Sequence, residues 1–357
     1  MDYHVITNFE GKGGAELMLC RLLFQINEPC KVISLMGCSD ELKSRLPNHV
    51  EVIALNATNA LSMLFTVVKI SSQVNKGDQI YSWMYHANVI AALVKLLLFC
   101  KVRLFWGVRH SLDDYDGEKR STKMAIWAGR LLRNIPDKVI YCSNRAKKQH
   151  EKFGYSNKIN SVYIPNGYFF PPVIEKSFYS NTIVFGTAGR FHDAKDYETL
   201  INAIAPILYD KPEAKLKMCG KGVTEDNSQL IEMLERAGIN KHQVDLYGQV
   251  TDMSEFYNHV DLFILSSKTE GFPNVLAEAA AHGCAVFSTD VGDASVIVNN
   301  STHIVPVADS IALTQVIENY LSLPSEQRKV IAFATTQHVR SQFSISHIAE
   351  QFFALGR

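Results

Sequence analysis

The chain has 357 residues, 47% of them hydrophobic and 20% charged, with as many acidic as basic side chains. This length is about twice that of a typical domain, and the composition is that of a folded protein, which excludes a disordered or low-complexity chain. With a formal net charge of zero, we expect no nucleic-acid partner.

The charge is unevenly divided along the chain. Residues 1–165 hold 22 Lys and Arg against 14 Asp and Glu, and residues 166–357 hold 14 against 22. This excess of positive charge predicts that the first half faces an anionic group, such as a phosphate-bearing molecule or a membrane surface. A chance asymmetry is the alternative.

Cysteines and apolar runs indicate where the protein resides. The seven cysteines are scattered without a paired motif, which is typical of reduced core thiols in a cytosolic protein. The first residues lack the positive segment of a signal peptide. The longest apolar stretch, residues 87–102, is interrupted by Lys95 and Lys101. We therefore expect a cytoplasmic protein without a membrane span.

Short apolar runs alternate with helical patterns, which predicts a doubly wound parallel α/β sheet. In the first half these runs lie at residues 4–7, 31–35, 50–53, 79–82, 103–106 and 138–142. A turn-rich exit at residues 163–167 and Pro171-Pro172 end this pattern, so we assign residues 1–170 to a first Rossmann-like domain.

The same alternation restarts at residues 183–186, 215–219, 244–247, 262–265, 285–288 and 303–306. It predicts a second Rossmann-like domain over residues 171–340, and we expect residues 341–357 to form a helix that crosses back to the first domain. Two such sheets facing each other enclose a deep cleft, and ligands bind beyond the carboxyl ends of their strands.

The first predicted strand leads into a glycine-rich loop, residues 9–16. Gly13 and Gly14 in such a loop can cradle a phosphate. The loop matches neither standard nucleotide motif, because Glu16 occupies the third glycine position of G-x-G-x-x-G and Ile6 stands where a Walker A loop begins with glycine. Tight packing of the turn is the alternative.

Histidines follow two further strands of the first sheet. His86 and Asn88 come after the strand at 79–82, and Arg109 and His110 after the strand at 103–106. Because both segments lie at the predicted carboxyl edge, we expect these four side chains to contact an acceptor substrate. A structural role is the alternative for each histidine.

The next stretch contains two weaker signals. Asp114-Tyr115-Asp116 matches the D-x-D metal motif, but it does not end a buried strand, so we interpret it as a loop acid pair. Residues 118–133 mix cations with apolar residues at helical spacing and include Trp127. This segment fits either an anionic membrane surface or an ordinary helix packed on its own sheet.

In the second half, Gly189-Arg190 and then Lys195 follow the strand at 183–186. Two fixed cations at a strand end can hold a diphosphate. Solvated surface cations are the alternative.

A second motif follows the strand at 262–265. Glu270 precedes a helix predicted over residues 275–282, Glu278 lies inside that helix, and Gly271 allows the backbone to approach a ligand closely. Free amides at the helix start can hold anionic or hydroxylated groups. Favourable interaction with the helix dipole is the alternative for each glutamate.

Together these motifs resemble glycosyltransferase family 4, the group 1 set of retaining GT-B enzymes, over nearly the whole chain. The most specific element is E-x7-E from Glu270 to Glu278 with Gly-Phe-Pro inside it, continuing through to Gly292. Residues 84–88 and 109–111 resemble bacterial surface-polysaccharide members, those of O-antigen and capsule synthesis.

The resemblance implies a role for each motif residue. It assigns Glu278 to the ribose hydroxyls, Glu270 to the donor-sugar hydroxyls, and Arg190 with Lys195 to the diphosphate. The implied donor site also includes the neighbouring positions of these motifs, Gly13, Gly14, Gly189, Gly271, Phe272, Pro273, Asn274 and Val275.

The resemblance implies two further roles, and the sequence departs from the family pattern at three places. The Gly13-Gly14 loop would close over the diphosphate, and His110 would lie near the transferred sugar as a catalytic residue with Arg190, Lys195 and Glu270. The family pattern often has glycine at Asp196 and at Asp293, and a more acidic turn at residues 220–222. These departures affect loop details.

The predicted activity is retaining transfer of a hexose or N-acetylhexosamine from a UDP-linked donor to a hydroxyl of a glycan acceptor. We expect this acceptor to be linked to polyprenyl diphosphate at the cytoplasmic face of the inner membrane, with the protein bound peripherally. No metal and no cofactor are expected, because two cations take the place of a metal. The alternatives are a sugar-nucleotide epimerase and a non-catalytic subunit that binds sugar nucleotides.

Overall fold

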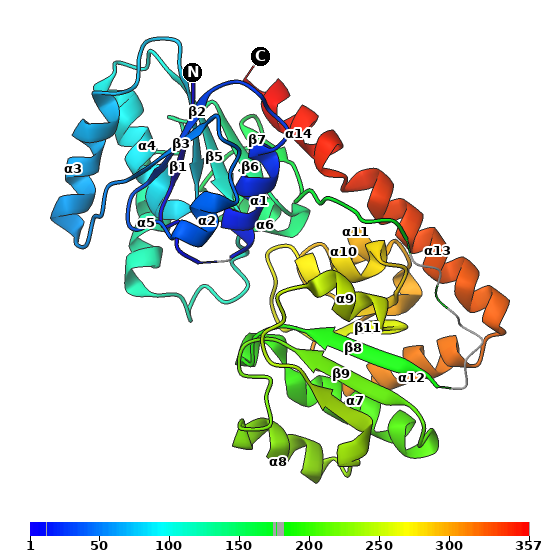
Figure 1. Ribbon diagram of the computed structural model, residues 1–357. Coiled ribbons are helices and arrows are strands. Elements are labelled where there is room, and N and C mark those ends of the chain that lie inside the picture. Colours follow the sequence, from blue (N-terminus) through cyan, green and yellow to red (C-terminus); the bar gives the residue numbers. More distant parts are fainter. Residues whose placement is uncertain (12, 174–175, 177–181, 357) are drawn as a thin grey trace. The chain divides into compact units, whose positions relative to one another are not determined.

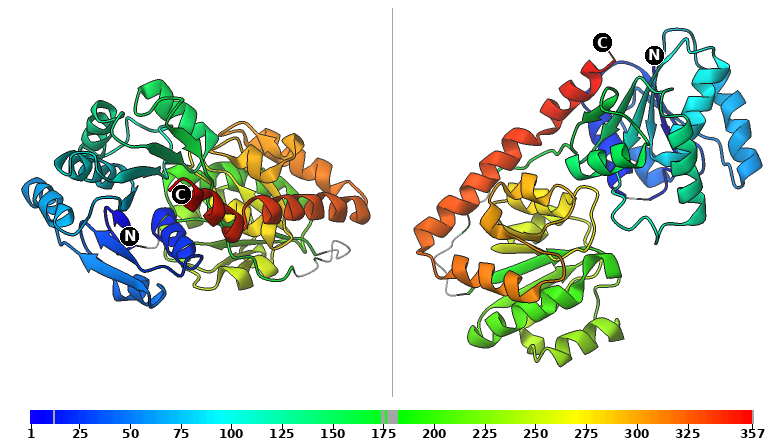
Figure 2. Two further views of the ribbon diagram at one scale, coloured as in Figure 1. Left: turned by 90° about the horizontal axis from the view of Figure 1, so that it is seen from above. Right: turned by 180° about the vertical axis from the view of Figure 1, so that it is seen from behind.

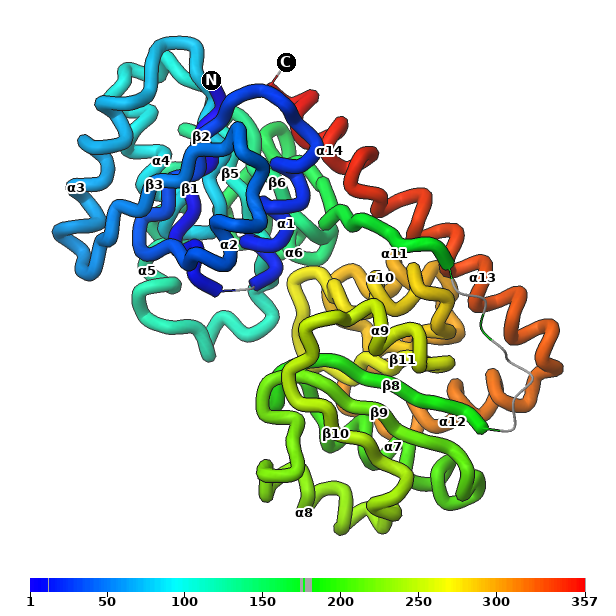
Figure 3. The backbone as a smooth tube through the Cα atoms, viewed as in Figure 1, coloured from blue at the N-terminus to red at the C-terminus, as the bar shows by residue number. Residues whose placement is uncertain are grey.

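The computed structural model describes residues 1–11, 13–173, 176 and 182–356. Lys12 of the glycine-rich loop therefore lies outside the described residues. The chain divides into two compact units, which we call unit 1 (Met1–Phe169 with Ile345–Arg357) and unit 2 (Phe170–Ser344). Figure 3 shows that the chain leaves unit 1 once and returns to it through its last helix.

Unit 1 contains a seven-stranded parallel sheet with the strand order β3-β2-β1-β4-β5-β6-β7 within the described residues. Its strands are short and mostly buried, as expected of a parallel sheet covered on both faces. They are β1 (Asp2–Ile6), β2 (Cys30–Ser34), β3 (Val50–Ala54), β4 (Gln79–Trp83), β5 (Arg103–Val108), β6 (Lys138–Tyr141) and β7 (Ser161–Tyr163).

Helices cover both faces of this sheet (Figure 1). One face is covered by α1 (Gly14–Leu23), α2 (Asp40–Ser44) and α14 (Ile345–Ala354), which bury their apolar sides in one core cluster. The other face is covered by α3 (Ala60–Ser71), α4 (Tyr85–Leu97), α5 (Arg120–Leu131) and α6 (Asn144–Phe153), which share a second cluster.

The last helix is held to unit 1 by aromatic stacking and by backbone contacts. The ring of Phe352 stacks on Tyr81 and Trp83 at centroid distances of 5.1 and 5.7 Å. Arg103 Nη1 donates a 2.9 Å hydrogen bond to the carbonyl of Gly356. The C-terminal segment is thus part of the hydrophobic core of unit 1.

Unit 2 contains a six-stranded parallel sheet with the order β10-β9-β8-β11-β12-β13 among the described residues. Its strands are β8 (Val184–Ala188), β9 (Lys215–Cys219), β10 (Val244–Leu246), β11 (Leu262–Leu265), β12 (Ala285–Thr289) and β13 (Ile304–Val305). Its helices are α7 (Tyr197–Asp210), α8 (Ser228–Arg236), α9 (Met253–Asn258), α10 (Asn274–Ala281), α11 (Ala294–Val298), α12 (Ser310–Leu321) and α13 (Ser325–Gln342), with short 3-10 turns at Asp193–Lys195, Lys241–Gln243 and Ser301–His303.

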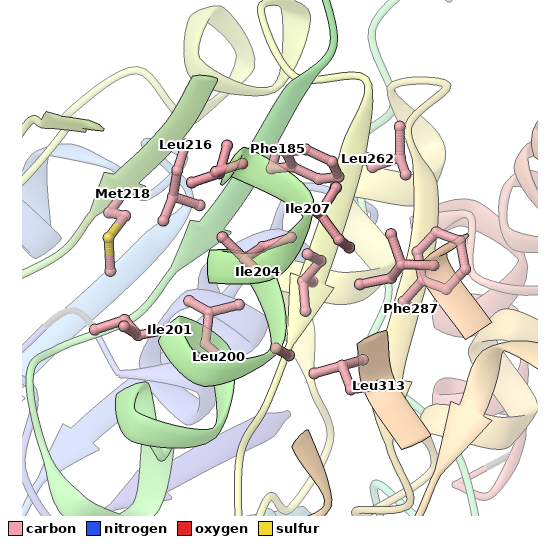
Figure 4. Packing of buried hydrophobic residues seen from close by; sticks show 14 of the residues in the cluster. Phe185, Leu200, Ile201, Ile204, Ile207, Leu216, Met218, Leu262, Phe287 and Leu313 are labelled. Atoms are coloured by element: carbon pink, nitrogen blue, oxygen red, sulfur yellow. The ribbon is translucent and has the colours of Figure 1, made fainter. Parts of the chain in front are cut away.

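The main core of unit 2 forms where α7 packs on the sheet. Figure 4 shows Leu200, Ile204 and Ile207 of this helix against Phe185 and Leu216 of β8 and β9. All of these side chains are at most 2% exposed. The alternation of apolar strands and amphipathic helices thus gives two doubly wound α/β sheets, and the predicted fold class is confirmed.

The structure bears on the predictions for the cysteines and for a membrane span. All seven cysteines are free, but Cys100 is exposed and Cys38 is half-buried, so the prediction that all are core thiols is wrong for these two. Cys100 follows the end of α4, where the chain turns at the surface. No described helix is both long and apolar enough to cross a bilayer.

Two histidines are fully buried in unit 1. His150 contacts the hydroxyl of Tyr85 at 2.8 Å and the carbonyl of Ala146 at 2.8 Å, and His4 stacks on Tyr81. Burial disfavours the imidazolium form, which lowers the pKa of His150 to about 4 and that of His4 to about 3.

The stability of unit 1 should therefore decrease as the pH falls from about 6.5 toward 4. Over this range the unfolded chain binds protons at His4 and His150 while the folded unit does not, so each histidine lowers the free energy of unfolding by about 1.4 kcal/mol per pH unit. All three tryptophans lie in unit 1, so urea unfolding followed by tryptophan fluorescence at pH 7 and pH 5 measures this slope. His150→Gln should flatten the slope and the exposed control His192→Gln should not; equal slopes in all three proteins would contradict the assignment.

Candidate functional site

Both sheets have a point where the strand order reverses, and polar loops follow the strands there. In unit 1 this point lies between β1 and β4, and in unit 2 between β8 and β11. Ligands of open parallel sheets bind outside the carboxyl ends of the strands at such a point. The predicted motif residues of unit 2 follow β8 and β11, so the fold brings these two loops together.

A charged cluster joins the two loops of unit 2. Lys195 Nζ donates a 2.5 Å hydrogen bond to Glu270 Oε1, and Ser267 Oγ donates to the same oxygen at 2.7 Å. Ser266 Oγ donates to the backbone carbonyl of Lys195 at 2.9 Å. The Lys195 and Glu270 side chains are 21% and 14% exposed, so the ion pair is largely shielded but still reachable from solvent.

Two glycines shape the backbone beneath this cluster. The stem of Lys195 lies over Gly189, where an added Cβ would be 3.2 Å from its Cδ and Cε atoms. Gly220, which follows β9, has φ +141°, and a Cβ there would lie 1.8 Å from the carbonyl oxygen of Gly189. Close backbone packing thus fixes the start of the loop that presents Arg190.

Arg190 directly follows Gly189 and is exposed. Within the described part of the chain its guanidinium forms no ion pair, whereas Lys195 is paired with Glu270. The site therefore offers one shielded and one solvent-facing positive charge.

Glu278 lies in α10, as predicted, and Glu270 lies in the loop before that helix. Tyr257 donates a hydrogen bond from its hydroxyl to Glu278 Oε2 at 3.2 Å. Burial, and then the nearby Glu278 carboxylate, raise the pKa of Tyr257, so it remains a neutral donor. The buried Tyr257 hydroxyl thereby orients the Glu278 carboxylate.

The Gly-Phe-Pro segment between the glutamates has mixed roles. The Phe272 side chain is buried and meets Phe343 edge-on at 5.6 Å, so this position has only its backbone to offer a donor. Gly292 has φ +52°, and a Cβ there would lie 2.9 Å from the carbonyl oxygen of Gly271. Asn274 and Val275 begin α10, and Pro273 caps it from the position before its first residue.

Asp196, a departure from the family pattern, caps the next helix. It has φ +48°, a conformation that glycine adopts readily and aspartate tolerates. Its carboxylate accepts from Thr199 Oγ1 at 2.8 Å and lies 3.5 Å from Lys268 Nζ. Asp293 is also buried.

In unit 1, the glycine-rich loop leads into α1. Gly13 precedes the helix and Gly14 is its first residue. The Glu16 side chain folds back over Gly13, and burial raises the pKa of its carboxyl group. Gly13 therefore lies directly beneath the Glu16 carboxylate, while Gly11, Gly13 and Gly14 remain exposed.

Asn88 and Arg109 of the predicted acceptor site have different surroundings, and only Asn88 is a correction. The Asn88 side chain is fully buried, where it accepts from Ser82 Oγ at 2.7 Å and donates to Tyr155 at 3.1 Å. The Arg109 guanidinium is buried over the ring of Trp83, and Nη1 donates to Asn166 Oδ1 at 2.9 Å. The Asn88 side chain therefore binds protein groups and is not available to contact an acceptor. Nε and Nη2 of Arg109 have no hydrogen-bond partner among the described residues, so its predicted contact with an acceptor stays a prediction.

The two histidines of the predicted acceptor site remain partly accessible. His110 Nε2 lies 2.6 Å from Glu118 Oε1, with the imidazole 40% exposed. His86 is half-buried, and burial lowers its pKa, while a hydrogen bond with the Ser121 backbone acts in the opposite direction. These histidines therefore lie beside the start of α5.

The D-x-D segment forms a turn, in which Asp114 Oδ1 accepts from the Gly117 backbone N–H at 3.1 Å. Over residues 1–11, 13–173, 176 and 182–356, no three His, Cys, Asp or Glu side chains are grouped so as to hold a metal ion.

Sequence reasoning missed four residues that orient the charged groups: Ser266, Ser267, Tyr257 and Glu118. The two serines follow β11 directly, so their position at a strand end was a usable signal. Tyr257 gave no such signal, because it reaches Glu278 from another helix, and Glu118 gave none because the loop between it and His110 has no regular periodicity.

Comparison with known proteins finds a family match within unit 2 and several glycosyltransferase relatives. Residues 182–322 match the family model described as Glycosyl transferases group 1. A capsular polysaccharide biosynthesis glycosyltransferase of Staphylococcus aureus, CapH, is 23% identical over 300 residues, which cover 82% of each chain. The N-acetylgalactosamine-N,N'-diacetylbacillosaminyl-diphospho-undecaprenol 4-alpha-N-acetylgalactosaminyltransferase of Campylobacter jejuni is 32% identical over 104 residues, 29% of this chain and 27% of that protein.

Among solved structures, Anabaena HepE in complex with UDP and glucose has a TM-score of 0.81 to this chain at 20% identity, covering 99% of this chain and 98% of that one. This likeness establishes the shared fold. Residues 182–322, which lie in unit 2, thus match the group 1 glycosyl transferase model, and the chain has the GT-B fold of these structural neighbours.

Proposed function

We propose that this protein transfers a hexose or N-acetylhexosamine from a UDP-sugar to a hydroxyl of a glycan acceptor, with retention of the anomeric configuration. The observation that carries the proposal is the cluster of Lys195, Glu270 and Ser267 beside the exposed Arg190 at the switch point of unit 2. It lies within the residues that match the group 1 model.

The two cations would bind the diphosphate of the donor. Arg190 presents several N–H donors in a planar fork, and Lys195 adds a compact charge close to Gly189. As the bond between the sugar and the diphosphate breaks, negative charge accumulates on the departing phosphate. Preorganised cations stabilise this charge more strongly in the transition state than in the ground state, so no obligatory metal or cofactor is needed.

The two glutamates would bind the hydroxyls at either side of the diphosphate. Glu270 Oε1 already accepts from Lys195 and Ser267, and among the described residues nothing donates to Oε2. That oxygen can accept a hydrogen bond from a donor-sugar hydroxyl. Glu278, oriented by Tyr257, would bind the ribose hydroxyls.

The chemical step would be attack by the acceptor hydroxyl on the anomeric carbon from the face that the diphosphate leaves. The bond from the anomeric carbon to the diphosphate oxygen breaks, the new glycosidic bond forms, and the hydroxyl proton passes to the departing phosphate to give UDP. Glu270 is held by Lys195 and Ser267, which favours a binding role for this carboxylate over a covalent intermediate. His110, paired with Glu118, would lie near the transferred sugar.

The proposed acceptor is a glycan linked to polyprenyl diphosphate, used in O-antigen or capsule synthesis at the cytoplasmic face of the inner membrane. Two observations support it: the Campylobacter relative is named for a diphospho-undecaprenol-linked acceptor, and residues 1–165 carry the excess of positive charge. The protein would then act as a peripheral membrane enzyme.

A screen of nucleotide sugars for release of free nucleoside diphosphate tests this function. Release of UDP that increases when a lipid-linked acceptor is added supports transfer. Conversion of the sugar nucleotide without an acceptor would instead identify an epimerase. Binding of UDP without turnover of any sugar nucleotide would identify a non-catalytic subunit.

Glu278→Gln should weaken UDP binding about tenfold, because a charge-assisted hydrogen bond to ribose is replaced by a neutral one worth less by roughly 1.4 kcal/mol. Isothermal titration calorimetry with UDP measures this change. Glu232→Gln is a matched control, since that carboxylate is 69% exposed on α8 and pairs only with Arg236 among the described residues. An unchanged Kd for Glu278→Gln would remove Glu278 from the donor site.

A further inference from the structure

Helix α3 of unit 1 exposes a continuous apolar face. Leu61, Leu64, Phe65 and Val68 follow the i, i+3, i+4, i+7 spacing that places side chains on one side of a helix, and each is between 55% and 65% exposed. The opposite side of α3 is buried on the core through Val67 and Ile70. The helix is therefore apolar on the side away from its own protein, where a solvated helix carries polar residues.

Helix α5 repeats this arrangement. Met124, Trp127 and Leu131 lie on one side of the helix and are 56% to 71% exposed, while Ala125 and Ile126 are buried. Packing on the sheet therefore does not account for the amphipathic pattern of residues 118–133, because the largest apolar side chains of this segment are exposed.

These two helices belong to the same face of unit 1. Helix α4 packs against both α3 and α5, and the three helices lie side by side in Figures 1 and 2. Helices of a parallel sheet begin at its carboxyl edge, so α3 and α5 both start at the edge where His86 and His110 lie. We call the seven exposed apolar side chains of α3 and α5 the apolar face.

Positive charge flanks the α5 side of the apolar face. Lys119, Arg120 and Arg130 are exposed on or beside α5. Near the C-terminal end of α5, a depression of about 560 Å³ is lined by Arg133, Lys148, Lys152 and Lys158 together with Glu151 and neighbouring polar residues. Residues 101–150 as a whole hold 12 Lys and Arg against 5 Asp and Glu.

We infer that the apolar face docks on an anionic lipid bilayer, with α3 and α5 lying in the interface and the flanking cations over lipid phosphates. Aromatic and aliphatic side chains flanked by Lys and Arg are the composition of an interfacial helix. A second copy of this chain is a poorer occupant, because two such faces would bring like charges together. Docking would hold the carboxyl edge of unit 1 near a lipid-linked acceptor. Only this biological purpose of the docking surface rests on the proposed function.

Flotation of the full-length protein with vesicles tests this surface. The protein should float with vesicles of phosphatidylcholine containing phosphatidylglycerol, bind vesicles of phosphatidylcholine alone more weakly, and bind less at high salt. Leu64→Ser/Phe65→Ser in α3 and Trp127→Ser/Leu131→Ser in α5 should each reduce binding at least about tenfold. The matched control Tyr209→Ser/Ile311→Ser replaces side chains of unit 2 that are 84% and 81% exposed and should bind as the parent does.

Each outcome bears on a single proposal. If both unit 1 variants float as well as the parent, or if the parent does not float, the docking surface is refuted. If instead light scattering shows a dimer that these variants dissociate, a second copy covers the face and the inference is equally overturned. UDP release from a UDP-sugar should be unchanged in all variants; vesicle binding without any sugar transfer would refute the proposed function and leave the surface intact.

Discussion

Replacing Arg190 by alanine should lower kcat by a factor of about 100 to 1000 while the protein remains folded. Arg190 is exposed and has no ion pair within the described residues, so its removal leaves no buried partner unsatisfied. What is lost is a fixed cation for the charge that develops on the departing diphosphate. Steady-state release of UDP from a UDP-sugar measures this effect.

The matched control for this variant is Arg236→Ala. That arginine is also exposed in unit 2, but it lies on α8 and pairs with Glu232. Its replacement should leave kcat unchanged, and Arg190→Lys should retain part of the activity because it keeps the charge and loses the fork of N–H donors. Equal kcat in Arg190→Ala and the parent would exclude a role for this residue in the reaction.

Gly220→Ala should destabilise unit 2 by about 3 kcal/mol or more, because its φ of +141° and its contact with Gly189 are both incompatible with a side chain. The added Cβ would lie 1.8 Å from a backbone oxygen, and a backbone cannot move aside as a flexible side chain can. Scanning calorimetry should show the transition of unit 2 at lower temperature. Tryptophan fluorescence, which reports on unit 1, should show its transition unchanged.

Gly238→Ala is the control that introduces backbone strain without a steric clash. Gly238 also has a positive φ, +70°, but a Cβ there meets nothing within 4 Å. Its replacement should cost only about 1 kcal/mol, the usual penalty for a left-handed alanine. If Gly220→Ala were no more destabilising than Gly238→Ala, the close approach of Gly220 to Gly189 would not support the loop.

Several features could be predicted because they depend on short segments. The alternation of apolar runs and helical patterns predicts both sheets, since the two periodicities are local properties of the chain. Positions in the loops that follow strands single out Lys195 and Glu270, because parallel strands all end at one edge. Ser267 meets the same criterion and was nevertheless not singled out, because a serine carries no charge to mark it.

Other features could not be predicted because they depend on how side chains are packed. Asn88 has the residue type and position of a binding site, yet its side chain is fully buried and bonded to Ser82 and Tyr155. The apolar residues of α3 have the composition of a core helix, although half of them point outward.

The sequence by itself therefore determined the two α/β sheets, the sheet edge at which the predicted site residues lie, and the charged motif residues of unit 2. Only the tertiary structure decided which of these side chains are accessible, that Lys195 and Ser267 converge on one oxygen of Glu270, and that α3 and α5 present apolar residues outward. The physical reason is that periodicity fixes the position of a residue along an element, whereas its exposure and partners depend on segments that are far apart in the chain and meet only on folding.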